Sequence, residues 1–254
     1  RRESKDEDDY TYFRKQVTLP TVPIIRATAN VSAAHQYELF INGTLAGEGQ
    51  AYHHPQYQYY RAFDVTSQLH AGQLNQLAVF THWFGGGQGR PAGDRGLLLK
   101  LVAHHADGST STVGTDESWK QSRATAWVLD NLTHRNRGEG VGYVEHIDAR
   151  LLITDWNTLA FDDSLWDKTT AVGPHPTAPW TGPLTPDLTR IRKTLIVPNS
   201  VTEKSEGKYV IDLGKVQAGM PQIHLSGGSP GSIVTMRGGY VLKDSKGAPE
   251  IILI

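Results

Sequence analysis

The stretch Gln36–Gly43 reads Gln-Tyr-Glu-Leu-Phe-Ile-Asn-Gly. Tyr37, Leu39 and Ile41 fall on one face of an extended chain, because successive side chains of a β-strand point to opposite sides. The Asn-Gly pair that follows suits a type I′ turn, whose two central residues both need positive φ. The stretch therefore predicts a strand with one buried face that turns back as a β-hairpin.

Outward from this stretch, short apolar runs and turn signals alternate along the whole chain. Strand-like runs recur at Leu97–Val102, Tyr209–Leu213 and Ser232–Met236, and turn dipeptides stand at Asp107-Gly108 and Gly227-Gly228. No long stripe with helical spacing accompanies them. This pattern predicts an all-β chain that opens with a jelly-roll or β-sandwich domain.

A proline-rich stretch interrupts the strand pattern. It contains prolines at positions 174, 176, 179, 183 and 186, which exclude a regular helix or a central strand. We expect a β-sandwich domain over residues 1–172, a linker over 173–190, and the start of a second, incomplete β-sandwich domain over 191–254. The apolar ending Glu250–Ile254 adds to the expectation that this second domain is incomplete. A chain that ended on such a strand would expose an aggregation-prone edge.

Composition excludes several classes of function. The 25 basic and 26 acidic residues give a formal net charge of −1, so neither nucleic acid nor an anionic membrane is an expected partner. The chain has no cysteine, which excludes a disulfide framework and a thiol nucleophile. The acidic run Asp6–Asp9 is expected to be a solvated, frayed end.

Several segments, in their order and spacing, resemble the N-terminal module of α-L-rhamnosidases, glycoside hydrolase family 78. Tyr37–Gly43 resembles that family's "YELYLNG" hairpin. The other matching segments are Tyr12–Val17, Tyr60–Thr66, His82–Gly86, Thr115–Lys120, Glu145–Arg150, Phe161–Trp166 and Tyr209–Gly214. Departures include an inserted Leu74, Ile147 where tyrosine is common, and Gly239-Tyr240 where the family usually has Ala-Glu. The similar segments span nearly the whole chain.

The resemblance implies a layout and a reaction. In this family β-sandwich domains precede an (α/α)6 barrel that carries the catalytic carboxylates, and the reaction inverts configuration with two carboxyl groups about 6.5–9.5 Å apart. The resemblance thus implies an accessory region of an enzyme that removes terminal α-L-rhamnose from glycosides or polysaccharides. We assign no catalytic residue here and expect this chain alone to be inactive. Its implied partners are a rhamnose-containing carbohydrate and the barrel.

Four residues are candidates for carbohydrate binding: Arg61, Trp83, Asp94 and Arg95. An aromatic plane can cover the apolar face of a sugar while charged groups bond its hydroxyls. The alternative is that Trp83 packs within the sandwich and Asp94 pairs with Arg95 or Arg61 to fix a loop. Some family members bind rhamnose through calcium, but this chain lacks a dense Asp/Asn loop, so we expect neither a metal nor a cofactor.

Two further functions stay open beside the accessory region: a free-standing carbohydrate-binding module and a purely structural β-domain. Asp148, Asp162 and Asp163 could be imagined as glycosidase acids, yet Asp162 and Asp163 fit the start of a short helical turn better. Sequons for N-glycosylation occur at Asn30, Asn42 and Asn131. They favour a secreted glycoprotein.

Overall fold

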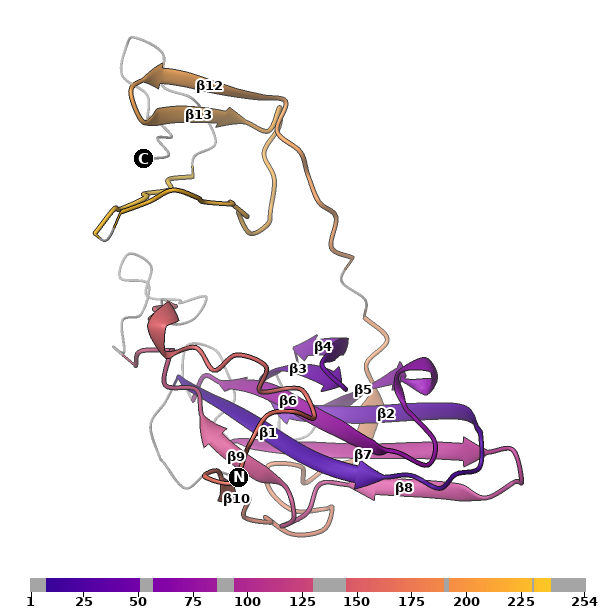
Figure 1. Cartoon of the computed structure of the whole chain (residues 1–254). Helices are drawn as coiled ribbons and strands as arrows, with labels where there is room; N and C mark the ends of the chain where they lie inside the picture. Colours follow the sequence, from indigo (N-terminus) through magenta and orange to yellow (C-terminus); the bar gives the residue numbers. More distant parts are fainter. Residues whose placement is uncertain are drawn as a thin grey trace. The chain divides into compact units, whose positions relative to one another are not determined.

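The computed structural model describes residues 8–50, 57–85, 94–129, 145–189, 192–229 and 231–238. The chain divides into two compact units, residues 1–189 and 190–254. Both are built from strands (Figure 1), which confirms the all-β prediction. Within the described ranges, no helix combines the length and apolar character that crossing a bilayer requires.

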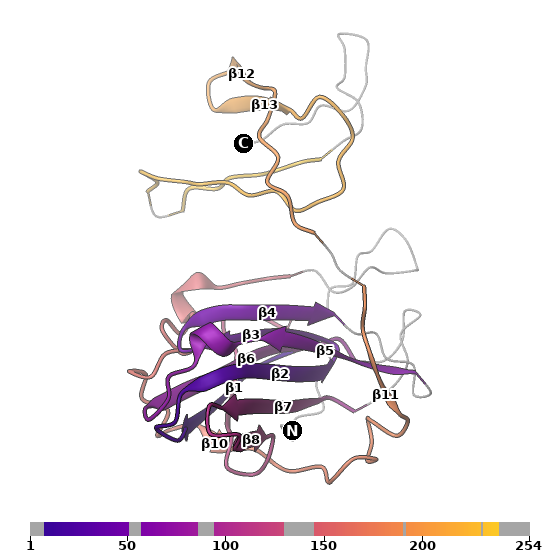
Figure 2. The same ribbon diagram turned by 90° about the vertical axis from the view of Figure 1, so that its right-hand side faces the viewer.

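Two sheets make up the first unit, and they stack face to face (Figures 1 and 2). The six-stranded sheet contains, in spatial order, β10 (Asp167–Lys168), β9 (Lys120–Arg123), β1 (Asp9–Thr18), β6 (Leu74–Trp83), β3 (Gln36–Ile41) and β4 (Thr44–Gln50). The five-stranded sheet contains β11 (Leu184–Pro186), β5 (Gln58–Asp64), β2 (Ile24–Ala34), β7 (Gly96–His105) and β8 (Thr110–Gly114). Two single-turn 3₁₀ helices, η1 (Thr66–Gln68) and η2 (Ala149–Leu151), complete the unit.

The β3–β4 hairpin forms where the sequence predicts it. Ile41 pairs with Thr44, and the two turn residues between them have positive φ, +50° at Asn42 and +83° at Gly43. The Asn42 side chain secures the turn: its Nδ2 donates to Gln68 O at 2.8 Å and to Asn75 Oδ1 at 3.0 Å. Its Oδ1 accepts from the backbone N–H of Gln76 at 2.7 Å.

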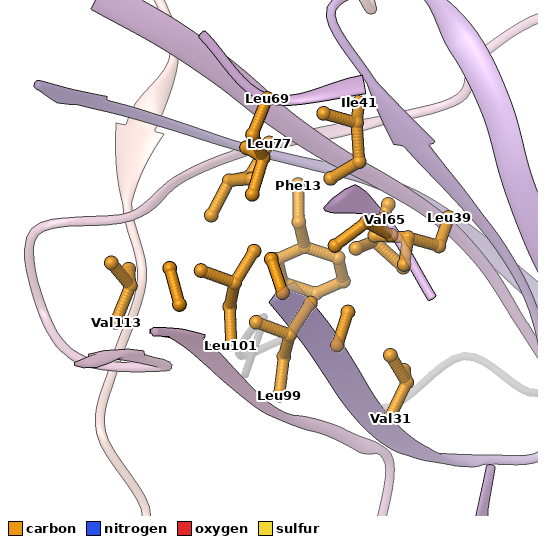
Figure 3. Close-up of a cluster of buried hydrophobic side chains, with 14 of the residues drawn as sticks. Phe13, Val31, Leu39, Ile41, Val65, Leu69, Leu77, Leu99, Leu101 and Val113 are labelled. Carbon is orange, nitrogen blue, oxygen red and sulfur yellow. The ribbon is translucent and has the colours of Figure 1, made fainter. Parts of the chain in front are cut away.

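The main core lies between the two sheets. Figure 3 shows side chains from both sheets converging around Phe13. Phe13, Leu39 and Leu77 come from the six-stranded sheet, while Leu99 and Leu101 come from β7, and none is more than 5% exposed. Each such burial contributes about 1.5–3 kcal/mol. Of these residues, Leu39, Leu99 and Leu101 lie in the two strand-like runs that the sequence pattern predicts.

A second apolar cluster covers the outer face of the six-stranded sheet. Tyr12 of β1 lies 4.5 Å from Trp156 and 5.9 Å from Trp166, measured between ring centroids. Tyr10 lies 5.3 Å from Trp127 in the same way. Residues 124–127 and 153–166 thus act as a cover over this face.

Arg14 holds that cover in place. Its side chain is fully buried, and Nε donates to Asp163 Oδ2 at 3.0 Å. Nη2 donates to Gln76 Oε1 at 2.7 Å and to Thr158 O at 3.1 Å. The guanidinium carbon lies 4.9 Å from the ring centroid of Phe161. The segment Phe161–Trp166 is therefore built around one buried arginine.

The proline-rich segment differs from the expected linker over 173–190. Trp180 is 3% exposed, and its Nε1 donates to Ser32 Oγ at 2.8 Å. Gln58 Nε2 donates to Pro179 O, Gly182 N donates to Gln58 Oε1 at 3.1 Å, and β11 then pairs in parallel with β5. The prolines prevent a central strand but leave the segment able to pack along a sheet edge. The first unit accordingly continues to Thr189 rather than ending at 172.

Among its described residues the second unit contains one hairpin, β12 (Ser200–Ser205) and β13 (Lys208–Asp212), with Gly207 at φ +71° in its turn. No described residue of this unit is buried. Its apolar side chains are largely exposed, with Val201 at 60% and Ile233 at 81%. The residues described here begin a β structure without enclosing a core of their own.

Candidate functional site

Three of the four candidate carbohydrate-binding residues lie at one end of the first unit. Trp83 is the last residue of β6 and pairs with Asp9 at the start of β1. Asp94 and Arg95 directly precede β7, whose first residue pairs with the last residue of β2. Residues 86–93, which connect Trp83 to this pair of charges, lie outside the described residues.

Arg95 is engaged within the protein. The residue is 8% exposed, and Nη1 pairs with Asp9 Oδ2. The same carboxylate oxygen accepts from the Thr11 hydroxyl at 3.2 Å. The Arg95 Cζ atom lies 5.2 Å from the Trp83 ring centroid, within cation–π range. Arg95 therefore fixes the Trp83 ring, and its buried ion partner is Asp9.

Trp83 carries a buried donor without an acceptor. Its side chain is half-buried, and Nε1 is one of three buried side-chain atoms among the described residues that lack a hydrogen-bond partner. Leaving such a group unpaired costs about 1–3 kcal/mol. Unpaired buried donors are uncommon, so this indole N–H is the feature of the cluster most suited to receive a ligand oxygen.

A buried acid–histidine pair lies beside Trp83, and the sequence did not indicate it. His82 Nε2 lies 2.7 Å from Asp8 Oδ1. The His82 ring stacks on Tyr10 at 3.8 Å between centroids. Burial raises the pKa of Tyr10, and the negative charges of Asp8 and Glu145 raise it further.

The expectation that the acidic run is solvated is wrong for the two described residues in it. Asp8 is 2% exposed and Asp9 is 1% exposed. Each carboxylate is held by a residue far along the chain, Asp8 by His82 and Asp9 by Arg95. This pairing offsets the free-energy cost of burying the two charges. A run of acidic residues in the sequence does not predict such pairing.

Arg61 takes part in a different structure. Its Nε donates to Asp187 Oδ2 at 2.7 Å, and Nη2 donates to Thr189 O at 3.1 Å. Nη1 donates to Glu48 O at 3.2 Å, so Arg61 also links β5 to β4 of the other sheet. Burial acts to raise the pKa of Asp187, but hydrogen bonds from Arg61 and Thr189 lower it overall. Arg61 thus anchors the end of the first unit.

The three aspartates considered as glycosidase acids have structural partners. Asp163 pairs with the buried Arg14 and with Lys120 Nζ at 2.8 Å. Asp162 accepts from Ser164 N at 2.9 Å. Hydrogen bonds from Arg150 lower the pKa of Asp148 to about 2. A general acid needs the opposite shift, because its carboxyl must stay protonated near neutral pH.

Two of the three sequons lie in described strands and turns. Asn30 stands in β2, where its Nδ2 donates to Lys100 O at 3.3 Å. Asn42 uses its amide in the hairpin turn described above. Asn131 lies outside the described residues. No group of three or more histidine or acidic side chains suited to a metal ion occurs in the part of the chain that the structure describes.

Comparison with known protein families gives one clear match. Residues 22–191 match the family described as "Alpha-L-rhamnosidase N-terminal domain". A curated relative, an alpha-L-rhamnosidase from Streptomyces avermitilis, is 29% identical over 249 residues, which cover 91% of this chain and 22% of the relative. The chain therefore spans about a fifth of that protein's length.

Solved structures of similar proteins agree with this match. A GH78 family rhamnosidase from Bacillus sp. GL1 is 32% identical with a TM-score of 0.61, over 71% of this chain and 18% of that one. The Streptomyces avermitilis alpha-L-rhamnosidase, solved in complex with L-rhamnose, is 25% identical with a TM-score of 0.62. That alignment covers 82% of this chain and 20% of the enzyme.

Proposed function

The chain belongs to the alpha-L-rhamnosidase N-terminal domain family, and we propose that it is the accessory β-region of an α-L-rhamnosidase. The parent enzyme would hydrolyse terminal α-L-rhamnose from glycosides or polysaccharides. One observation carries the proposal: the family match covers every strand of the two sheets of the first unit except β1, while the chain spans only about a fifth of its relative.

The state of the carboxyl groups supports a catalytic centre elsewhere. An inverting glycosidase needs one protonated carboxyl group and one carboxylate about 6.5–9.5 Å apart. Every described carboxyl group with a shifted pKa is shifted downward, at Asp64, Asp107, Asp116, Asp148, Asp162 and Asp187. None of these six described groups has the raised pKa of a general acid, and we propose that the acid and the base of the inverting reaction lie in a barrel domain of the parent enzyme.

Carbohydrate binding at the Trp83 end is part of the proposal. The unpaired buried indole N–H supports Trp83 as a donor to a sugar oxygen, with Arg95 positioning the ring. Asp94, the residue before Arg95, is exposed. The relative solved with L-rhamnose makes that sugar the natural probe. Arg61 is assigned instead to holding Asp187 and Thr189.

An activity assay tests the proposal. The 254-residue chain and the full product of its encoding gene are each incubated with an aryl α-L-rhamnoside. We expect release of the aryl group by the full product only, with inverted configuration of the first rhamnose formed. Turnover by the chain alone would refute the assignment of catalysis to another domain. A full product of only 28.0 kDa would favour a free-standing carbohydrate-binding module.

Secretion belongs to the same proposal, because the polymers and glycosides expected as substrates lie outside cells. It is supported only by the sequons. Fractionation of the native source, with detection of the protein in medium and in cells, tests it. Retention of the protein inside intact cells would contradict it.

A further inference from the structure

The turn between β3 and β4 contains the one Asn-Gly pair in the sequence, Asn42-Gly43. In such a pair the backbone nitrogen of the glycine can attack the asparagine side-chain carbonyl carbon, Cγ, because glycine has no side chain to hinder the approach. The bond from Gly43 N to Asn42 Cγ forms, the bond from Cγ to Nδ2 breaks, and Nδ2 leaves as ammonia with the proton from Gly43 N. Water then opens the five-membered ring and leaves aspartate or isoaspartate at this position.

Three hydrogen bonds hold the Asn42 carboxamide in its planar form. Nδ2 donates to Gln68 O at 2.8 Å and to Asn75 Oδ1 at 3.0 Å, and Oδ1 accepts from Gln76 N at 2.7 Å. Both N–H donors of the amide are therefore used. Ring closure would make Cγ tetrahedral, which misaligns all three bonds, and departure of Nδ2 would remove two of them. The folded turn thus opposes the reaction at each step.

The surroundings of this turn are fixed as well. Asn75 is fully buried. Its Nδ2 donates to His70 O at 2.9 Å, and its Oδ1 also accepts from His70 N at 2.8 Å. Asn157 Nδ2 donates to Gly43 O at 3.5 Å, and a Cβ atom at Gly43 would lie 3.2 Å from Thr158 Cγ2. Rearrangement of the turn therefore requires these neighbours to move too.

The products of the reaction do not fit this site. Aspartate at position 42 would present only acceptor oxygens to Gln68 O and Asn75 Oδ1, which are acceptors themselves. Two hydrogen bonds would become contacts between acceptors. Isoaspartate would add one atom to the main chain between Ile41 and Thr44, which pair directly across the two-residue turn. Either product should therefore weaken the β3–β4 hairpin.

We propose that Asn42 is a self-modification site controlled by the fold. It is stable in the folded first unit, and it converts to aspartate or isoaspartate when this unit opens. The only co-reactant is water. Because the products do not fit the turn, conversion hinders refolding, and a reversible loss of the fold becomes irreversible with time.

Mass spectrometry of the 254-residue chain, incubated in mildly alkaline buffer with and without denaturing urea, tests this site. Conversion of Asn42 adds about one dalton to fragments that contain it. We expect the conversion to be at least about tenfold slower without urea, because the reaction then waits for local opening of the fold. Equal rates in the two conditions would overturn the proposal, as would the absence of conversion in urea.

Asn30 is the internal control for this assay. It is followed by Val31, whose branched side chain hinders attack by the backbone nitrogen, so it should stay unmodified in both conditions. Conversion of Asn30 as fast as that of Asn42 would show that the Asn-Gly pair has no special reactivity and would overturn the site.

Two further measurements test the effect on the fold. Chain held in urea until Asn42 has converted should refold to a smaller extent than chain refolded at once. Asn42→Asp supplies one product directly, and its urea midpoint should lie below that of the unmodified chain. The matched control is Asn30→Asp, which alters a half-buried asparagine with a single hydrogen bond of 3.3 Å to Lys100 O and should shift the midpoint less.

The outcomes for the two variants decide this part of the proposal. Failure of Asn42→Asp to fold, while Asn30→Asp folds, would support it as firmly as a lowered midpoint. An unchanged midpoint in Asn42→Asp, together with full refolding of the converted chain, would overturn the claim that the products hinder refolding.

Discussion

Arg14 Nε donates to Asp163 Oδ2 at 3.0 Å, joining residues that lie 149 positions apart in the sequence. The arginine side chain is fully buried and the aspartate side chain is 20% exposed. Burial lowers the pKa of Arg14, and the Asp163 carboxylate partly offsets this by holding the guanidinium charged. The contact attaches the cover segment to the outer face of the six-stranded sheet.

Replacement of Arg14 should strongly destabilise the first unit. Arg14→Met leaves Asp163 without this partner and four backbone or side-chain acceptors without a donor. Breaking one side of a buried pair typically costs about 3–5 kcal/mol. Urea unfolding followed by tryptophan fluorescence measures the change. Arg150→Ala, which removes an 88% exposed arginine from its pair with Asp148, is the control and should leave the midpoint unchanged.

The Arg61–Asp187 pair should make stability depend on acid pH. The pKa of Asp187 is lowered in the folded protein, so its contribution is complete above the unfolded value of about 3.9 and is lost as pH falls through the folded value. The urea midpoint of Asp187→Asn should lie below that of the unmodified chain at pH 7 and approach it below pH 4. A difference that stays constant between pH 7 and pH 3 would contradict this linkage.

Tyrosine titration should report the outer aromatic cluster. Burial raises the pKa of Tyr12 to about 12, and burial followed by nearby carboxylates raises that of Tyr10. Because these folded pKa values exceed the unfolded value of about 10, the stability they contribute is present below pH 10 and declines at higher pH. Absorbance at the phenolate band should show at least two of the ten tyrosines ionising only with unfolding. Ionisation of all ten before the fold is lost would be inconsistent with this packing.

Asn42 should remain unglycosylated even where secretion adds glycans. Both N–H bonds of its amide are used, toward Gln68 O and Asn75 Oδ1, and an attached sugar would replace one of them. Peptide mass mapping of the chain secreted from a eukaryotic host should find Asn42 unmodified. A glycan at Asn42 on protein with the native unfolding midpoint would show that the amide bonds are dispensable.

Trp180 should determine whether the proline-rich segment stays docked. Trp180→Ala removes a buried indole, a change that typically costs about 3–5 kcal/mol, and should expose residues 173–189 to protease. Trp180→Phe retains most of the apolar area and loses the hydrogen bond to Ser32. Its cleavage rate should therefore lie between those of the unmodified chain and Trp180→Ala. The rate of cleavage in this segment, measured by mass spectrometry, distinguishes the three forms. Equal cleavage in all three would show that Trp180 does not hold the segment.

Strands and turns were predictable because their signals are local. Tyr37, Leu39 and Ile41 alternate within six residues, and all three are buried. Asn42-Gly43 forms the predicted turn because few other residues accept positive φ in succession. The proline-rich stretch was interpreted less well, since proline excludes a central strand but says nothing about the contacts that Trp180 makes with Ser32, a residue 148 positions away.

By itself, the amino-acid sequence determined the all-β class, the positions of the main strands and the family to which the chain belongs, because side-chain periodicity and turn chemistry act over a few residues. The tertiary structure decided which charges are buried together. Asp9 with Arg95, Arg61 with Asp187, and Arg14 with Asp163 are brought together only by the strand pairing and sheet packing of the folded chain. A buried ion pair offsets the cost of removing both charges from water only when the packing holds the partners in good hydrogen-bonding geometry, and no local pattern of residues encodes that geometry.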